Sequence, residues 1–151
     1  MRALLVEDDE NKRAQILRLV REGWPEAEIE TAGSYRGGLD RIQNRQFDLV
    51  LLDMTMPTYD IDFDEEGGRP RAFAGRDILR QMERRGIAAP VVVVTQFDKF
   101  GEGGETKTRD QLDRELAAAH PSNYRGMVYY NTALEGWKEE LTRKVEALRV
   151  G

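Results

Sequence analysis

The chain has 151 residues, 40% hydrophobic and 34% charged, a balance that is typical of a globular domain and excludes an intrinsically disordered chain. The net charge of −5, spread over both halves, argues against a nucleic-acid-binding surface, and the absence of cysteine excludes disulfides and thiolate chemistry. No apolar run approaches the roughly 18 residues that span a bilayer, and the start MRALLVEDD becomes acidic too early for a signal peptide, so we expect a cytoplasmic protein with no membrane partner.

Strand-like and helix-like segments alternate along the chain. Short apolar runs indicate the strands, and apolar residues at helical spacing indicate the helices. In chain order we expect a strand at 3–6, a helix at 10–22, a strand at 27–32, a helix at 35–45, a strand at 49–52, a helix at 76–85, a strand at 91–94, a helix at 109–119, a strand at 126–130 and a helix at 133–149. Capping-box patterns beginning at Thr108 and Thr132 support the starts of the last two helices.

Three of these strands are uninterrupted apolar runs: ALLV at 3–6, LVLL at 49–52 and VVVV at 91–94. Such runs are typical of strands that are buried on both faces of a parallel sheet. Together with the alternation of five strands and five helices, they predict one doubly wound α/β domain over residues 1–151.

Two long polar segments, rich in glycine and acidic residues, interrupt this pattern at about 57–74 and 97–107. Both follow the carboxyl end of a predicted strand, which is the edge where open α/β sheets bind ligands. Loops of this length inside a compact domain are usually functional or mobile. We therefore expect two enlarged loops beside a binding site.

Acidic side chains come directly after two predicted strands. Glu7 and Asp8 follow the first strand, Asp53 follows the third, and Thr95 follows the fourth. If the first and third strands are neighbours, three carboxylates converge, and their repulsion requires a cation. Oxygen ligands without histidine or cysteine favour a hard ion such as Mg²⁺. A carboxylate beside such an ion can accept a phosphoryl group and form an aspartyl phosphate, to which the Thr95 hydroxyl can donate a hydrogen bond. The alternative is a set of solvated acidic residues at strand ends.

The segments LLVEDDE, LVLLDMTMP and VVVVTQF resemble the receiver domain of two-component response regulators. The resemblance covers the chain apart from the two enlarged loops. It implies a flavodoxin-like, five-stranded parallel sheet of order 2-1-3-4-5, with helices on both faces. It also implies Mg²⁺ as cofactor and a histidine kinase or phosphotransfer protein as partner.

Site residues follow from the resemblance position by position. Asp53 matches the phosphoacceptor and Thr95 the switch hydroxyl. The implied metal ligands are the carboxylates of Glu7, Asp8 and Asp53 and the backbone carbonyl of Thr55. Asp9 lies just after the acidic pair, and we expect it to begin the first helix, where its charge suits the helix dipole.

The chain departs from the family pattern at the last strand. Receivers carry a lysine followed by proline there, and the lysine pairs with the phosphoryl group. In the segment RGMVYYNTALEG the matching position is Asn131, and no register places a lysine there. Two loop lysines, Lys99 and Lys107, are candidates to replace it. The resemblance is therefore to an atypical receiver.

Three functions remain open. The first is a stand-alone receiver, phosphorylated at Asp53, that signals through contact with an unidentified protein and has no enzymatic activity beyond its own phosphorylation and dephosphorylation. The second is a pseudo-receiver that binds partners without phosphorylation, which the missing lysine favours. The third is a phosphatase-like hydrolase, which requires a second aspartate at the position of Thr55.

Overall fold

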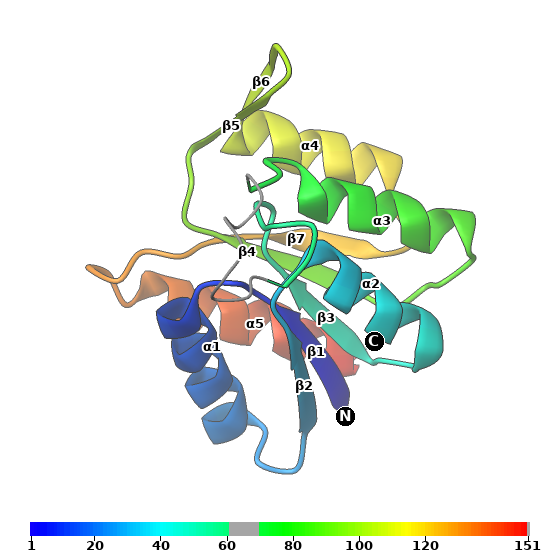
Figure 1. Cartoon of the computed structure of the whole chain (residues 1–151). Helices are drawn as coiled ribbons and strands as arrows, with labels where there is room; N and C mark the ends of the chain where they lie inside the picture. Colours follow the sequence, from blue (N-terminus) through cyan, green and yellow to red (C-terminus); the bar gives the residue numbers. More distant parts are fainter. Residues whose placement is uncertain (61–69, 151) are drawn as a thin grey trace.

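The structure is a computed structural model that describes residues 1–60 and 70–150. Five parallel strands form one sheet in the order β2-β1-β3-β4-β7 (Figure 1). They are β1 (Arg2–Val6), β2 (Glu28–Ala32), β3 (Leu49–Leu52), β4 (Val91–Thr95) and β7 (Tyr124–Tyr129). The predicted flavodoxin-like order 2-1-3-4-5 is confirmed, with β7 as the fifth strand.

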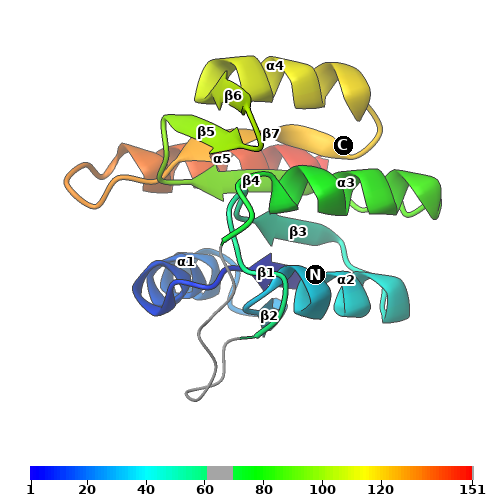
Figure 2. The ribbon, with the colours of Figure 1, turned by 45° about the horizontal axis from the view of Figure 1, so that its top comes forward.

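Helices cover both faces of this sheet (Figure 1). They are α1 (Glu10–Gly23), α2 (Tyr35–Asn44), α3 (Ala74–Arg84), α4 (Arg109–Ala119) and α5 (Gly136–Val150). Helices α1 and α5 pack on one face, and α2, α3 and α4 pack on the other, where α2 and α3 lie side by side (Figure 2). Within the described part of the chain, no helix has both the length and the apolar character that crossing a bilayer requires.

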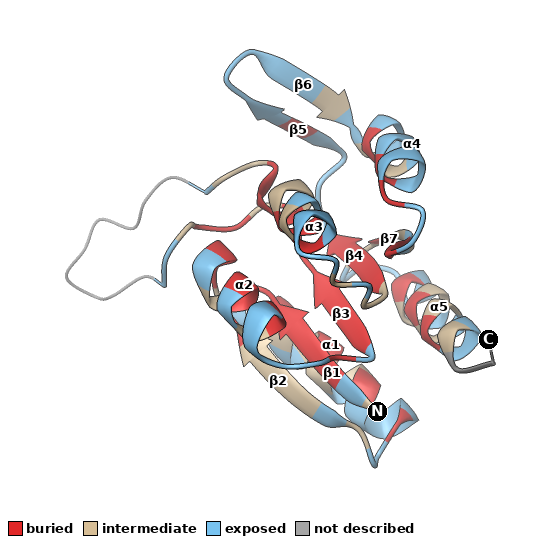
Figure 3. Ribbon diagram, turned by 90° about the vertical axis from the view of Figure 1, so that its right-hand side faces the viewer, coloured by how far each residue is buried: buried red, intermediate tan, exposed pale blue. Residues whose placement is uncertain are grey.

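The central strands are buried on both faces (Figure 3). In β3, Val50 and Leu52 point into the core under α2, α3 and α4, whereas Leu49 and Leu51 point into the core under α1 and α5. Because successive strand residues point to opposite faces, a strand that is covered twice must be apolar at every position. This is the physical reason for the uninterrupted apolar runs in the sequence.

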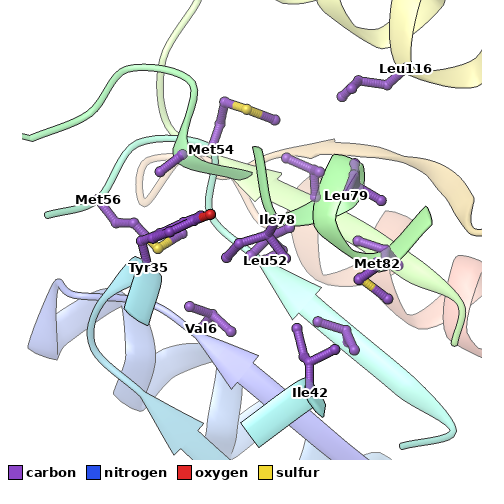
Figure 4. Packing of buried hydrophobic residues seen from close by; sticks show 14 of the residues in the cluster. Val6, Tyr35, Ile42, Leu52, Met54, Met56, Ile78, Leu79, Met82 and Leu116 are labelled. Carbon is purple, nitrogen blue, oxygen red and sulfur yellow. The ribbon is translucent and has the colours of Figure 1, made fainter. Parts of the chain in front are cut away.

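The segment after β3 packs into the larger core. Met54 and Met56 are fully buried and lie with Tyr35 of α2 and Ile78 of α3 (Figure 4). Met56 also pairs with Arg71 through two backbone hydrogen bonds of 3.2 and 2.9 Å. This pairing joins the two ends of the enlarged segment at 57–74, of which residues 61–69 lie outside the described part.

The second enlarged segment is a β-hairpin, so the prediction of a loop at 97–107 was wrong in this detail. Strand β5 (Lys99–Glu102) pairs with β6 (Glu105–Thr108), and the hairpin extends beside α4 (Figures 1 and 3). Its turn consists of Gly103 and Gly104, with φ values of +58° and +85°. A two-residue hairpin turn with positive φ at both positions strongly favours glycine.

The sequence predicted capping residues for three helices, and two of these predictions are confirmed. Asp9 caps α1, because its side chain accepts a hydrogen bond from the backbone N–H of Lys12 at 3.0 Å. Thr108 and Gln111 form the predicted capping box of α4. The capping box predicted at Thr132 was wrong, since α5 begins at Gly136 and the preceding turn is closed by a bond from the Ala133 N–H to Asn131 Oδ1.

Gly75, in the first turn of α3, permits a close contact with the segment that follows β3. A Cβ atom at this position would lie 2.7 Å from the Asp53 backbone oxygen and 3.1 Å from Met54 Cα. We predict that Gly75→Ala lowers the free energy of unfolding by roughly 1–3 kcal/mol, because backbone must move. Urea denaturation measures this change.

The matched control is Gly23→Ala at the end of α1, where a Cβ meets nothing within 4 Å. This variant should be neutral or gain up to about 1 kcal/mol, since alanine favours the helix. Equal stability of the two variants would contradict the close contact at Gly75.

Candidate functional site

The predicted acidic residues meet at the carboxyl edge of the sheet. The Glu7 N–H donates to the Ala32 carbonyl at 2.9 Å, and the Asp53 N–H donates to the Val6 carbonyl at 3.0 Å. These two bonds continue the strand pairing by one residue and fix both backbones. As a result, Glu7, Asp8 and Asp53 each offer a carboxylate oxygen within 4.8 Å of the others. The predicted convergence of the three carboxylates is confirmed.

The three carboxylates differ in burial. Glu7 is 1% exposed and Asp53 is 5% exposed, whereas Asp8 lies at the surface. Burial, together with the nearby charge of Asp53, raises the pKa of Glu7 from 4.5 to about 8, against the opposing effect of Lys12. Burial also raises the pKa of Asp53, although Lys12 opposes this change. The pocket therefore holds buried carboxyl groups that favour protons or cations.

Lys12 supplies a cation inside this pocket, which the sequence analysis missed. Its side chain is 1% exposed, and Nζ lies 2.7 Å from Glu7 Oε2 and 3.4 Å from Asp53 Oδ1. Nζ also donates to the Val94 carbonyl at 2.8 Å. These three acceptors match the three N–H donors of an ammonium group. Lys12 thus joins α1 to the ends of β1, β3 and β4.

A pattern in the sequence points to the burial of Lys12. Lys12, Ile16 and Val20 follow one another at a spacing of four residues, and all three are buried on the inner face of α1. A lysine in line with core residues at the start of a helix faces the sheet edge rather than solvent. The polar neighbours of Lys12 in ENKRAQ concealed this signal.

Neither loop lysine that was considered as a replacement lies in the pocket. Lys99 is exposed on β5 of the hairpin. Lys107 is on β6, and its Nζ lies 3.2 Å from Glu115 Oε1 of α4. The hypothesis that Lys99 or Lys107 supplies the pocket cation is therefore not supported by their positions.

Thr95 and Thr55 lie where the sequence predicts them, at the ends of β4 and β3. Thr95 is fully buried, and its Oγ1 accepts a hydrogen bond from the Phe97 N–H at 3.2 Å. The Thr55 hydroxyl donates to the Ala72 carbonyl at 3.1 Å and ties the segment after Asp53 to the start of α3. The backbone carbonyl of Thr55 as a metal ligand stays a prediction.

An aromatic side chain stands beside the pocket at the end of β7. Tyr130 is buried on the face of α1 and α5, and Lys12 Nζ lies 5.8 Å from the centre of its ring. The ring packs against Trp137 of α5 at a centroid distance of 4.8 Å. The Asn131 side chain instead closes the turn before α5. The end of β7 therefore presents a neutral aromatic residue, and the cation comes from α1.

The donor set fits a divalent ion. When all three carboxylates are ionised, they and the one ammonium leave two negative charges, and every carboxylate offers oxygen atoms, the ligands that Mg²⁺ prefers. The fold and the pocket together define the class of this protein. It is a flavodoxin-like, doubly wound α/β domain with a carboxylate site at the carboxyl edge of its sheet.

Comparison with known proteins identifies the family. The response regulator receiver domain matches residues 3–110, and the chain belongs to this family. Over 148 residues it is 32% identical to the Detocs response regulatory protein DtcB of Enterobacter cloacae (strain JD6301), with 96% of this chain and 99% of DtcB covered. Receiver domains are signalling modules of two-component systems, bind Mg²⁺ at an acidic pocket, and interact with histidine kinases or phosphotransfer proteins.

Solved structures show the same fold at lower identity. The response regulator TrrA of Thermotoga maritima, in complex with Mg²⁺-BeF, is 19% identical with a TM-score of 0.59, and the match covers 95% of this chain and 97% of TrrA. The chemotaxis response regulator CheY4 of Vibrio cholerae is 17% identical with a TM-score of 0.64, over 97% of both chains. These similarities confirm the predicted fold.

The raised pKa of Glu7 makes stability depend on pH. The folded chain holds a proton on Glu7 more tightly than the unfolded chain does, so this contribution is complete below about pH 4.5 and is lost as the pH rises to about 8. Without divalent metal, we predict that the wild type loses stability relative to Glu7→Gln across this window. The loss should exceed the roughly 1.4 kcal/mol that corresponds to one pKa unit.

Urea denaturation of both proteins at pH 4.5, 6 and 8, with a chelator present, measures the difference. The two proteins should be about equally stable at the lowest pH, where Glu7 is protonated. If the wild type instead gains stability relative to Glu7→Gln as the pH rises, then Lys12 outweighs desolvation and the pKa of Glu7 is not raised.

Proposed function

We propose that this protein is a receiver that accepts a phosphoryl group on Asp53 with the help of Mg²⁺. The observation that supports this most is the position of Asp53. Its buried carboxylate lies beside Glu7, Asp8 and Lys12 at the sheet edge of a chain that belongs to the receiver family. The bound Mg²⁺-BeF reported for TrrA is in line with this chemistry.

In the proposed reaction, an oxygen of Asp53 attacks the phosphorus of a phosphohistidine donor, the P–N bond breaks, and the imidazole leaves with the bonding electrons. Burial favours the protonated, unreactive form of Asp53, so the neighbouring Lys12 charge must help keep the carboxylate ionised. Mg²⁺ held by Glu7, Asp8, Asp53 and the Thr55 carbonyl would neutralise charge on the transferred group.

Thr95 completes the proposed site. Its hydroxyl oxygen accepts a bond from the Phe97 N–H, which leaves the hydroxyl proton to be donated to a phosphoryl oxygen. Burial of Thr95 at the end of β4 makes such a bond sensitive to the position of the segment that carries Phe97. A movement there would change the surface around Phe97, which is 41% exposed.

We further propose that the protein is a stand-alone receiver in the cytoplasm. Its output would be a contact with another protein. Exposed aromatic residues support a protein contact, because Tyr59 follows Asp53 by six residues and Phe97 follows Thr95 by two. Histidine kinases or phosphotransfer proteins are the expected phosphoryl donors. We propose no enzymatic activity beyond phosphorylation and dephosphorylation of the protein itself.

The second candidate function is a pseudo-receiver that works without phosphorylation. Lys12 favours it, because an internal ammonium already balances part of the pocket charge. A phosphatase-like hydrolase is the weakest alternative, since the position of its acid is Thr55 and that hydroxyl is bonded to the Ala72 carbonyl.

Phosphorylation distinguishes these functions directly. We predict that the protein incubated with Mg²⁺ and acetyl phosphate gains the mass of one phosphoryl group, and that Asp53→Asn abolishes the gain by removing the acceptor. Asp8→Asn should slow it at least about tenfold, since it removes a metal ligand. Intact-protein mass spectrometry over time measures all three.

Asp9→Asn is the matched control for Asp8→Asn. Asp9 is the neighbouring acidic residue, but it caps α1, and asparagine preserves the cap. This variant should be phosphorylated at the rate of the wild type. A wild-type protein that remains unmodified while Mg²⁺ is bound would favour the pseudo-receiver, and steady release of phosphate without a stable adduct would favour the hydrolase.

A further inference from the structure

A completely buried lysine at the first turn of a helix is an unusual arrangement that the metal site does not explain. The positive end of a helix dipole lies at its N-terminus, so an ammonium near the start of α1 is unfavourable there. Removing that ammonium from water adds a further cost. Lys12 also contacts Glu7 and Asp53, two of the carboxylates that are proposed to bind Mg²⁺, and thus competes with the metal for them.

The geometry places this ammonium next to the carboxylate that would carry the phosphoryl group. Nζ is 3.4 Å from Asp53 Oδ1, whereas its contact with Glu7 Oε2 is 2.7 Å. The hydrogen bond to the Val94 carbonyl anchors Nζ one residue before Thr95. A phosphoryl group bonded to Asp53 would therefore lie within reach of the ammonium, which is itself anchored beside the strand end that carries Thr95.

Phosphorylation changes the balance of charges around Nζ. The Asp53 carboxylate loses its own charge when it becomes an acyl phosphate, and the attached group brings up to two negative charges. The ammonium then finds its strongest partner on the phosphoryl oxygens rather than on the carboxylate. Glu7 also accepts a hydrogen bond from the Asp9 N–H at 3.1 Å, so its carboxylate does not depend on Lys12 alone for a partner.

We propose that Lys12 binds the phosphoryl group on Asp53, so that helix α1, and not the last strand of the sheet, supplies the cation of the phosphorylated site. This inference rests on the proposed function. The residue that follows β7 supports this proposal. Tyr130 lies on the β7 side of the pocket, with its ring centre 5.8 Å from Lys12 Nζ, and it carries no positive charge. The phosphorylated state is then tied to α1 and, through Tyr130 and Trp137, to α5.

The competing explanation is that Lys12 only neutralises buried carboxylates. The two explanations differ in one expected effect, the change in affinity for a phosphoryl mimic. Loss of a neutralising charge leaves the binding of Mg²⁺ stronger or unchanged, and it leaves the binding of a phosphoryl mimic at saturating Mg²⁺ unchanged. Loss of a phosphoryl ligand also leaves Mg²⁺ binding stronger or unchanged, but it weakens binding of the mimic.

The test measures the affinity of Lys12→Met for Mg²⁺ alone and for beryllofluoride at saturating Mg²⁺, by isothermal titration calorimetry. We predict that beryllofluoride binds at least about tenfold more weakly than to the wild type, as expected for loss of a charge-assisted hydrogen bond. Mg²⁺ should bind as well as to the wild type or better, since a competing cation has gone.

Lys138→Met is the matched control, because Lys138 lies over Trp137 on the same face, with Nζ 3.0 Å from Glu135 Oε2 and 5.9 Å from the indole centre. It should bind both ligands as the wild type does. Lys12→Gln, which keeps a neutral donor, provides a second test if Lys12→Met does not fold, and it should also weaken beryllofluoride selectively.

Two results would overturn the inference and leave the proposed function intact. One is wild-type affinity for beryllofluoride in the Lys12 variants. The other is an equal loss of Mg²⁺ and beryllofluoride binding, which would show that Lys12 only maintains the pocket. If the wild type itself takes neither beryllofluoride nor a phosphoryl group while Mg²⁺ binds, the proposed function is wrong and this inference falls with it.

Discussion

The contact of the Lys12 ammonium with Glu7 and Asp53 is the interaction on which the rest of the site depends. Two buried carboxylates at adjacent strand ends repel each other, and solvent does not screen them. The Lys12 ammonium contacts both carboxylates and offsets this repulsion. The same ammonium bonds to the Val94 carbonyl, so a single side chain joins α1 to three neighbouring strands. The polar pocket is therefore also a structural connection, and changes in its charge act directly on α1.

The fold explains why these groups meet. Parallel pairing of β1 with β3 carries Glu7 and Asp53 to adjacent places, and Gly75 lets the start of α3 approach the backbone of Asp53. The chain belongs to the response regulator receiver family and is similar to DtcB, and we propose this edge as its site of phosphorylation. What distinguishes the chain is the source of the cation. Asn131, at the position where the family resemblance implies a lysine, closes the turn after β7, and the neighbouring Tyr130 lies beside the Lys12 ammonium.

The sequence predicted those features that follow from a repeated local pattern. Uninterrupted apolar runs identified the central strands, and acidic residues directly after two of them identified the convergence of Glu7, Asp8 and Asp53. The sequence did not predict that Lys12 is the cation of the pocket. Its position depends on how α1 packs against the ends of strands that are distant in sequence. The hairpin was missed although Gly103 and Gly104 signal its turn, because β5 and β6 are mostly polar. The start of α5 was placed too early because Asn131, rather than Thr132, closes the preceding turn.

A crystal structure of the protein with Mg²⁺ and beryllofluoride would test the central claim most directly. We predict beryllofluoride on Asp53, Mg²⁺ held by Glu7, Asp8, Asp53 and the Thr55 carbonyl, and Lys12 Nζ within hydrogen-bonding distance of a fluorine atom. The hydrogen bond of Nζ to the Val94 carbonyl should persist. Beryllofluoride bound at Asp53 while Lys12 remains paired with Glu7 alone, out of reach of every fluorine, would contradict the account.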